Sequence, residues 1–256
     1  MPYDEIVRHR RALHKIPELM YDLPKTQAYV LDALEGLSCA VEAVAETGVL
    51  AYFDAGKAET VAFRADMDAL PVAEMAQHDY RSEHPGQMHA CGHDGHMAIL
   101  LAFAAWVDRN IDSLPRNVLL MFQPAEESGA GGERVVESGC LERRCVTRAF
   151  AIHVDPMLPV GTVASRPGAL MARASEIHLI IEGKAGHAAV PGAGADALAA
   201  AVDFVSGAYR AQAEWAGDAP HRLKFCQFQS GNSTNVIADR AHIKGSLRTF
   251  SDADFH

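Results

Sequence analysis

Residues 88–100 read MHACGHDGHMAIL and place three histidines, a cysteine and an aspartate directly before an apolar run. One residue separates Cys91 from His93, so both side chains can face one ion from an extended or turning segment. Thiolate and imidazole groups bind zinc and related divalent cations. Alternatively, Cys91 is a small buried apolar side chain and His93 caps the following helix; this segment alone favours neither interpretation. We expect His89 and His96 to be structural histidines or to support a metal ligand.

Two adjacent carboxylates, Glu126 and Glu127, lie in the segment QPAEE after the apolar run NVLLMFQ. Adjacent carboxylates after a buried strand are costly unless a positive charge lies between them. One of them could ligate a metal while the other takes a proton from water. The alternative is a solvated surface pair, which the Glu–Glu dipeptide alone favours. Pro124 indicates a fixed backbone, which favours the functional interpretation.

Two further polar segments, RADMDALP and HVDP, contain Asp66, Asp68 and His153. Either aspartate could orient a ligand histidine or cap the next turn, and a lone histidine such as His153 is more often structural. Three of the four polar segments directly follow an apolar, strand-like run. Sites in open parallel sheets form at the carboxyl ends of strands, so this shared placement predicts one site more strongly than any single motif.

The elements that would position these residues are visible as apolar runs separated by turn residues. Helices are expected at about 3–14 and 25–37, and the run HMAILLAFAAWV predicts a deeply buried helix. Short runs that are apolar on both faces predict strands covered on each side: GVLAYF, TVAFRAD, NVLLMFQ and RAFAIHV. This alternation predicts an α/β domain with a mostly parallel sheet.

The pattern changes near Arg173. Three segments alternate polar and apolar residues, as half-exposed strands do: SEIHLIIEG, RLKFCQFQ and AHIKGSLRTF. The segment DALAAAVDFVSGAYR predicts an amphipathic helix whose buried face contains Leu198, Val202, Val205 and Tyr209. We therefore expect a boundary near residues 168–174, with a catalytic domain at 1–172 and a smaller α+β domain at 173–256.

Composition excludes several classes of protein. Apolar residues make up 49% of the 256 residues, which is enough for a sizeable core. The 33 acidic residues outnumber the 23 Lys and Arg, and the net charge of -10 argues against nucleic acid and anionic membranes as partners. The charged N-terminus does not resemble a signal peptide, and the five cysteines are odd in number and scattered. These features predict a cytoplasmic protein without disulfides.

Together, the segments resemble the hippurate hydrolase and auxin-conjugate (IAA-amino acid) amidohydrolase branch of the aminoacylase/carboxypeptidase metallohydrolases. The matching motifs extend along the whole chain: RRALHKIPEL, RADMDALPV, MHACGHDGHMAILL, FQPAEE, GTVASRPGALMA, GKAGHAAVPG, NVI and GSLRTF. The resemblance implies two divalent cations, zinc or manganese. It also implies that Glu126 is the general base, and that four residues are metal ligands: Cys91, His93, Glu127 and His153.

The resemblance further implies that the second domain is an inserted lid that carries a homodimer contact. In that family a histidine matching His187 reaches into the partner's site, and residues matching Asn235 and Arg248 hold substrate. Arg248 would pair with the substrate carboxylate. The family completes its sheet after the lid and supplies a last ligand histidine there. This sequence stops at His256, so we expect an incomplete catalytic domain.

The leading functional hypothesis is a metal-dependent amidohydrolase that cleaves N-acyl amino acids of the hippurate, N-acetyl or indole-acyl type. The alternative is a truncated, inactive relative that retains metal binding or lid-mediated dimerisation. A third hypothesis is a cysteine hydrolase that uses Cys91 with a neighbouring histidine.

Overall fold

The computed structural model describes residues 3–127, 129–215 and 220–255, and its chain forms two compact units, Met1–Pro159 and Val160–His256. His256, the expected end of the partial lid, lies outside the described residues. The expected domains, 1–172 and 173–256, differ from these units by the segment 160–172, and that division stays a prediction. Among the described residues, no helix has both the length and the apolar character needed to span a membrane.

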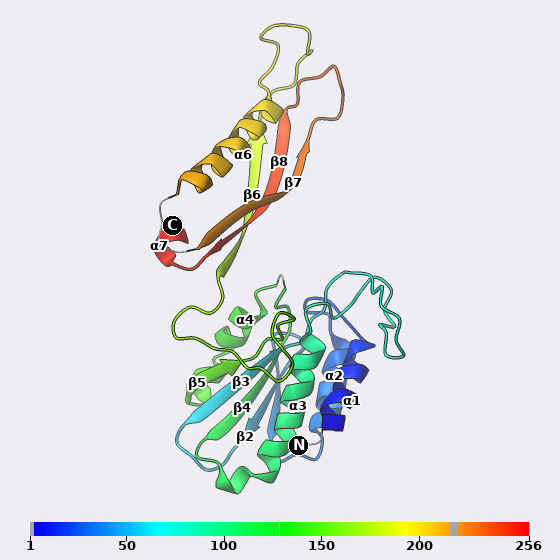
Figure 1. The fold of residues 1–256 in the computed structure, drawn as a ribbon, viewed down its shortest axis with the longest axis vertical. Helices are drawn as coiled ribbons and strands as arrows, with labels where there is room; N and C mark the ends of the chain where they lie inside the picture. Colours follow the sequence, from blue (N-terminus) through cyan, green and yellow to red (C-terminus); the bar gives the residue numbers. More distant parts are fainter. Residues whose placement is uncertain (1–2, 128, 216–219, 256) are drawn as a thin grey trace. The chain divides into compact units, whose positions relative to one another are not determined.

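Unit 1 alternates helices with the strands of one five-stranded sheet (Figure 1). The strand order is β1-β2-β4-β3-β5. The strands are β1 (Ala40–Val44), β2 (Gly48–Phe53), β3 (Thr60–Asp66), β4 (Asn117–Gln123) and β5 (Val146–Ala151). The helices are α1 (Tyr3–His14), α2 (Pro24–Leu34), α3 (His93–Arg109), α4 (Gly131–Glu137) and α5 (Cys140–Arg143), with a 3-10 turn at Ile111–Ser113.

The sheet is mixed, which corrects the expectation of a mostly parallel sheet. β3 pairs in parallel with both β4 and β5, as the βαβ alternation predicts. β2, however, is antiparallel to both β1 and β4. Two short connections cause this: a tight hairpin between β1 and β2, in which Ala45 and Glu46 take positive φ values of 46° and 70°, and the short segment 54–59 that leads from β2 to β3, the parallel neighbour of β4. A strand that returns through a short hairpin must run antiparallel.

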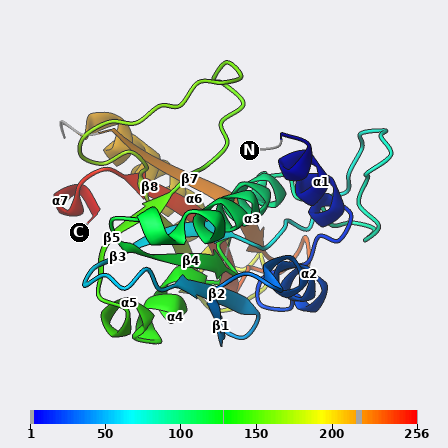
Figure 2. The ribbon, with the colours of Figure 1, turned by 90° about the horizontal axis from the view of Figure 1, so that it is seen from below.

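Helices cover both faces of this sheet, which explains why its central strands are apolar throughout (Figure 2). Alternate residues of β4 point to opposite faces. Leu120 and Phe122 pack with Met97 and Leu101 of α3 in the larger core, while Leu119 packs with residues of α4 and α5 in the smaller one. Every residue of β4 is buried, as expected. β5 differs, because it is an edge strand and five of its six residues are exposed.

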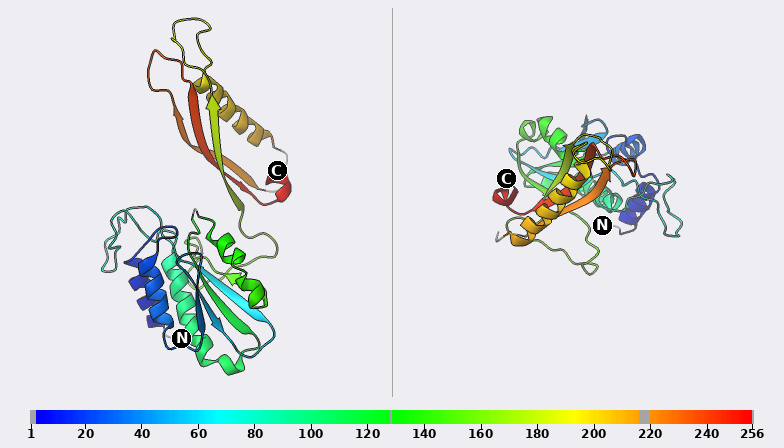
Figure 3. Two further views of the ribbon diagram at one scale, coloured as in Figure 1. Left: turned by 180° about the vertical axis from the view of Figure 1, so that it is seen from behind. Right: turned by 90° about the horizontal axis from the view of Figure 1, so that it is seen from above.

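Unit 2 is a three-stranded antiparallel sheet with one long helix on one face (Figure 3). Its elements are β6 (Arg173–Glu182), α6 (Ala197–Glu214), β7 (His221–Ser230), β8 (Arg240–Thr249) and the short α7 (Asp252–Phe255), in sheet order β6-β8-β7. Ala197 and Ala201 of α6 pack on Ile243 of β8. The predicted helix face was partly wrong, because Leu198 and Val202 are 43% and 47% exposed.

Candidate metal centre

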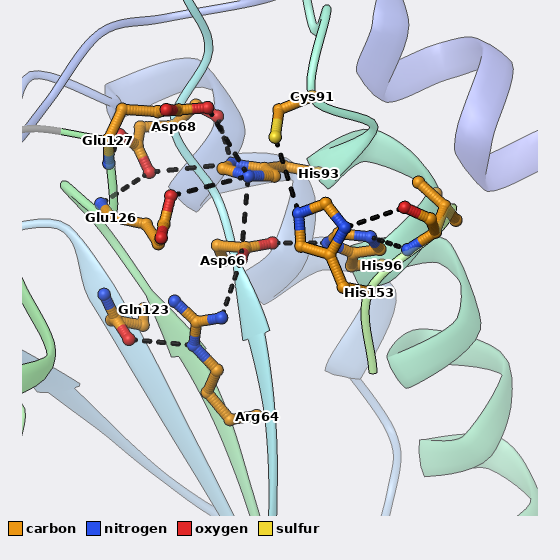
Figure 4. Close-up of polar contacts among 12 residues, drawn as sticks. Arg64, Asp66, Asp68, Cys91, His93, His96, Gln123, Glu126, Glu127 and His153 are labelled. Atoms are coloured by element: carbon orange, nitrogen blue, oxygen red, sulfur yellow. Dashed lines mark hydrogen bonds and ion pairs between the residues drawn. The ribbon is translucent and has the colours of Figure 1, made fainter. Parts of the chain in front are cut away.

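The predicted polar segments of unit 1 meet at the carboxyl ends of β3 and β4 and the start of α3 (Figure 4). Asp66 is the last residue of β3, and its register partner in β4 is Gln123, the last residue of that strand. The parallel pairing therefore places QPAEE beside RADMDALP. His93 is the first residue of α3, whose apolar body is anchored in the core.

His93 is fully buried, and its orientation is fixed by a hydrogen bond from Nδ1 to the carbonyl oxygen of Asp68 at 2.7 Å. This bond leaves Nε2 as the lone-pair nitrogen. Nε2 lies 3.6 Å from Asp66 Oδ2 and 3.8 Å from a carboxylate oxygen of each of Glu126 and Glu127. Among the described residues it has no hydrogen-bond partner. A lone pair that faces three carboxylates requires a positive charge between them.

Asp68 holds the two glutamates in place through their backbone. Its Oδ1 accepts a hydrogen bond from the amide of Glu126 at 2.8 Å, and its Oδ2 accepts one from the amide of Glu127 at 3.1 Å. The carboxylate is fully buried. Ala125, which precedes the pair, has a φ of 52° and turns the chain back toward β3. The two carboxylates are therefore directed by a built turn and are not a free surface pair.

Asp66 lies at the centre of a second set of contacts. Its Oδ1 accepts a 2.6 Å hydrogen bond from His96 Nδ1, and its Oδ2 a 2.7 Å bond from Arg64. Burial alone would raise the pKa of Asp66, but the His96 hydrogen bond and the Arg64 charge outweigh it and lower that pKa to about 2. His96 Nε2 accepts the amide proton of Val154 at 2.9 Å. Both nitrogens of His96 are thus occupied, which fits the expected supporting role.

Cys91 and His153 meet across the same edge. The thiol donates to His153 Nε2 at 3.4 Å, while His153 Nδ1 donates to the carbonyl of Val154 at 2.8 Å. Burial, followed by the charge of Glu127, raises the pKa of Cys91 to about 12. A thiol with this pKa is protonated near neutral pH, which argues against the cysteine-hydrolase hypothesis. Ligation to a cation would remove the proton.

Glu126 is the more solvent-accessible of the two glutamates, with 40% of its side chain exposed against 23% for Glu127. Partial burial, followed by the negative charge of Glu127, raises the pKa of Glu126 above its ordinary value. A carboxylate with a raised pKa is a better proton acceptor. Glu126 therefore has the solvent access and the basicity that a general base needs.

The donor set fits divalent cations. Two groups of donor atoms each lie within 4.8 Å of one another: Cys91, His93 and His153 form one, and His93, Glu126 and Glu127 the other. Oε1 of Glu127, like Nε2 of His93, is buried without a hydrogen-bond partner among the described residues. Thiolate, imidazole and carboxylate together match zinc, and the carboxylates also suit manganese. A zinc or manganese ion would provide these two neighbouring buried atoms with a partner.

In unit 2, the structure brings together two of the three predicted substrate-binding residues. The amide of Ala188, next to His187, donates to the carbonyl of Asn235 at 3.0 Å. The Asn235 side chain accepts from Ser233 Oγ at 2.7 Å. Arg248 lies near the far end of β8, roughly 27 Å along the strand from its start at about 3.4 Å per residue. Within this unit, Arg248 is therefore remote from the other two.

Sequence reasoning missed Arg64, which joins the two strand ends. Its guanidinium donates to Asp66 and, through Nε, to Gln123 Oε1 at 2.8 Å. Arg64 and Asp66 are two residues apart in β3 and share a face of the sheet. A basic and an acidic residue two positions apart in an otherwise apolar strand could have indicated this role of Arg64.

The chain is similar over most of its length to known proteins. The sequence profile of Peptidase family M20/M25/M40 matches residues 62–243. IAA-amino acid hydrolase ILR1-like 5 of Arabidopsis thaliana is 38% identical over 255 residues, which are 99% of this chain and 58% of the plant protein. N-acetyldiaminopimelate deacetylase of Streptococcus pneumoniae is 37% identical over 96% of this chain and 67% of its own length.

Among solved structures, the YXEP protein of Bacillus subtilis is similar in fold as well as in sequence. Its crystal structure is described as that of a dinuclear metal binding peptidase from the M20 family. It matches this chain with a TM-score of 0.80 and 32% identity, over 98% of this chain and 65% of that one. The chain thus spans less than two thirds of the length of this protein and of the plant relative.

Proposed function

Because this chain belongs to peptidase family M20/M25/M40, we propose that it is a metal-dependent amidohydrolase that cleaves the amide bond of N-acyl amino acids. This membership confirms the resemblance inferred from the motifs. The proposal is carried by one observation: the buried Nε2 of His93 faces three carboxylates and has no hydrogen-bond partner in the part of the chain that the structure describes. It is supported by the names of two relatives, which denote hydrolysis of an amino-acid conjugate and removal of an N-acetyl group.

Four residues would hold two divalent cations, zinc or manganese: Cys91, His93, Glu127 and His153. The description of the Bacillus subtilis relative as a dinuclear metal binding peptidase supports two ions. When bound, such ions supply Lewis-acid stabilisation of charge on the amide oxygen and lower the pKa of water. Asp68 holds the ligand His93 through its carbonyl oxygen. Asp66 holds His96, which in turn accepts the amide of Val154, the neighbour of the ligand His153.

Glu126 acts on protons in the proposed reaction. It takes a proton from the attacking water and returns it to the leaving nitrogen, so that the amine departs neutral. Its accessible carboxylate and raised pKa suit both steps. Asp68 fixes the backbone from which Glu126 projects and so sets the direction of this transfer.

Unit 2 would supply substrate contacts through His187, Asn235 and Arg248. Arg248 is exposed and lies directly opposite Arg222 of β7. Like charges at directly opposed positions of a sheet destabilise it unless an anion lies between them. A substrate carboxylate is such an anion, and a planar guanidinium binds it well.

We also propose a homodimer through unit 2. The exposed apolar side chains Leu198 and Val202, one turn apart on α6, support an interface there. Light scattering of the whole chain tests it. A Val202→Glu variant should have half the mass of the parent if this surface forms the interface, and a parent of monomer mass would contradict the proposal.

The function is tested by release of free amino acid from benzoyl-, acetyl- and indole-acyl amino acids by the chain loaded with Zn²⁺ or Mn²⁺. Activity should disappear on exhaustive chelation and return with metal. Hydrolysis that survives chelation would contradict the metal mechanism and favour a thiol enzyme. Failure of the metal-loaded chain to hydrolyse any of these amides would contradict the proposed activity.

A further inference from the structure

A second group of imidazoles and carboxylates lies outside the site described above, where α1 meets the long segment between β3 and α3 (Figure 1, Figure 2). His14 comes from α1, while Glu74 and His78 come from the long segment. Their donor atoms all lie within 4.8 Å of one another. None of these side chains belongs to the proposed catalytic set.

The hydrogen bonds of His14 show that a positive charge is needed at this place. Its Nδ1 lies 2.7 Å from Asp94 Oδ2, and its Nε2 lies 3.1 Å from Glu74 Oε1. A neutral imidazole has one N–H, so it can donate to only one of these carboxylates. If Nδ1 donates to Asp94, then the lone pair of Nε2 points at an oxygen that also carries lone pairs. A proton or a cation between them removes this conflict.

His78 directs a second imidazole at the same oxygen. Its Nε2 lies 2.8 Å from Glu74 Oε1, and its ring stacks on Tyr80 with centroids 3.8 Å apart. The other oxygen of Glu74 accepts the amide of Ser82 at 2.7 Å, which fixes the carboxylate. Both His14 and Glu74 are buried, whereas 22% of the His78 side chain is exposed and gives solvent ions access.

His89 adds an independent indication that the cluster serves a ligand. It is 3% exposed, and its ring centroid lies 6.4 Å from that of His14. Neither of its ring nitrogens has a hydrogen-bond partner among the described residues, and neither does Nδ1 of His78. Buried polar atoms without partners are rare in native proteins, and an ion or its bound water would provide partners.

We propose that His14, Glu74 and His78 form an additional divalent-cation site, separate from the proposed catalytic centre. Two imidazoles and one carboxylate form the His₂Glu set that zinc accepts with a fourth position left for water. Asp94, which contacts the other nitrogen of His14, completes the carboxylate–histidine–metal arrangement that orients such ligands. Arg10 pairs with Asp94 at 2.9 Å and balances that carboxylate, so Glu74 is the anion left to the cation.

The site would join α1 to the segment before α3. Asp94 follows His93 directly, so an ion on His14 would lie behind the first turn of the helix that carries the proposed catalytic histidine. An ion there would tie to α1 a segment around Glu74 and His78 that has no regular secondary structure.

Zinc content of the whole chain, measured after equilibrium dialysis against Zn²⁺, tests the proposal. His78→Phe keeps a ring to stack on Tyr80 and should bind about one Zn²⁺ per chain less than the parent. His178→Phe is the matched control, because His178 also lies beside a carboxylate, Glu176 at 3.2 Å, but is exposed and belongs to no cluster of three metal-donor atoms among the described residues. It should bind as much zinc as the parent.

Cobalt substitution separates this site from the catalytic one. Only the proposed catalytic centre contains a thiolate, so the thiolate-to-cobalt absorption should persist in His78→Phe and disappear in Cys91→Ala. The two sites are thus measured separately, and absence of metal at the catalytic centre would not change the zinc bound at His78. If His78→Phe fails to fold, His78→Asn makes the same test with a smaller side chain. A folded His78 variant that binds as much zinc as the parent overturns the proposal.

Discussion

At the scale of single residues, Asp68 determines how the two glutamates are presented, because its carboxylate accepts both of their amide protons. Asp68→Ala leaves two amides without acceptors, so the free energy of unfolding should fall by about 1–3 kcal/mol. Urea denaturation measures the loss. Asp68→Asn, which keeps one oxygen acceptor, should lose less, and an Asp68→Ala variant as stable as the parent would refute this role.

The types of residue at the candidate site could be predicted from the sequence, but the contacts between distant residues that hold them in place could not. Cys91, His93 and the strand-end aspartates were identified by type and spacing. The Glu–Glu pair alone favoured a solvated loop, because its partner Asp68 is 58 residues away along the chain. The contact between Asp68 and the glutamate amides depends on the parallel register of β3 and β4. The pattern of apolar and polar residues within each segment does not predict that register.

At the scale of elements, the turn between β4 and α4 requires Gly131. A Cβ there would lie 1.7 Å from the carbonyl oxygen of Pro124, so an alanine must displace the backbone that carries Glu126 and Glu127. Gly131→Ala should therefore unfold at a lower temperature than the parent and bind less metal. Gly95 is the matched control, since a Cβ there meets nothing within 4 Å. Gly95→Ala in α3 should gain roughly 0.5–1 kcal/mol. Equal stability of Gly131→Ala and the parent would show that this turn does not require a glycine.

The junction of α1 with α3 should give the metal-free protein a pH-dependent stability. The hydrogen bond to Asp94 raises the pKa of His14 in the folded state despite its burial, and Glu74 adds to this rise. A raised folded-state pKa means that the contribution of His14 is complete below pH 6.5. This contribution to stability is lost as the pH rises through the pKa that His14 has in the folded protein.

Urea denaturation in chelator, from about pH 6 to about pH 9, measures this contribution. The parent should lose more stability over this range than His14→Gln. His9 is the control on the same helix, since burial and then Arg8 lower its pKa, so His9→Gln should keep the parental loss above pH 6.5. Parallel profiles for the parent and His14→Gln would rule out the assignment.

Periodicity predicted the central elements well and the peripheral ones poorly. The buried strands β2, β3 and β4 coincide with the predicted apolar runs. β1 was missed because four of its five residues are exposed and its sequence, AVEAV, has no continuous apolar run. The face of α6 was misjudged because its small alanines, and not Leu198 and Val202, pack on the sheet. Side-chain size alone does not reveal which face lies against a sheet.

At the scale of the whole molecule, two units with separate cores are joined by residues 152–172, which contain no helix or strand. Val160 and Val163 in this segment are almost wholly exposed. Brief digestion with a low-specificity protease should therefore cut first between residues 152 and 172 and leave two resistant fragments. Mass spectrometry identifies the cut, and initial cleavage within α6 or the sheet of unit 1 would contradict the division.

In the proposed amide hydrolysis, the metal ligands cooperate with a separate proton acceptor, and the Glu126→Gln variant removes only the proton acceptor. The measurement is hydrolysis of an N-acyl amino acid by the metal-loaded parent and variant, with the metal content of both determined in parallel. Metal content should be unchanged and turnover should fall by about 10²–10⁴-fold, the usual contribution of a general base. A variant that hydrolyses the amide at the parental rate would contradict this role of Glu126.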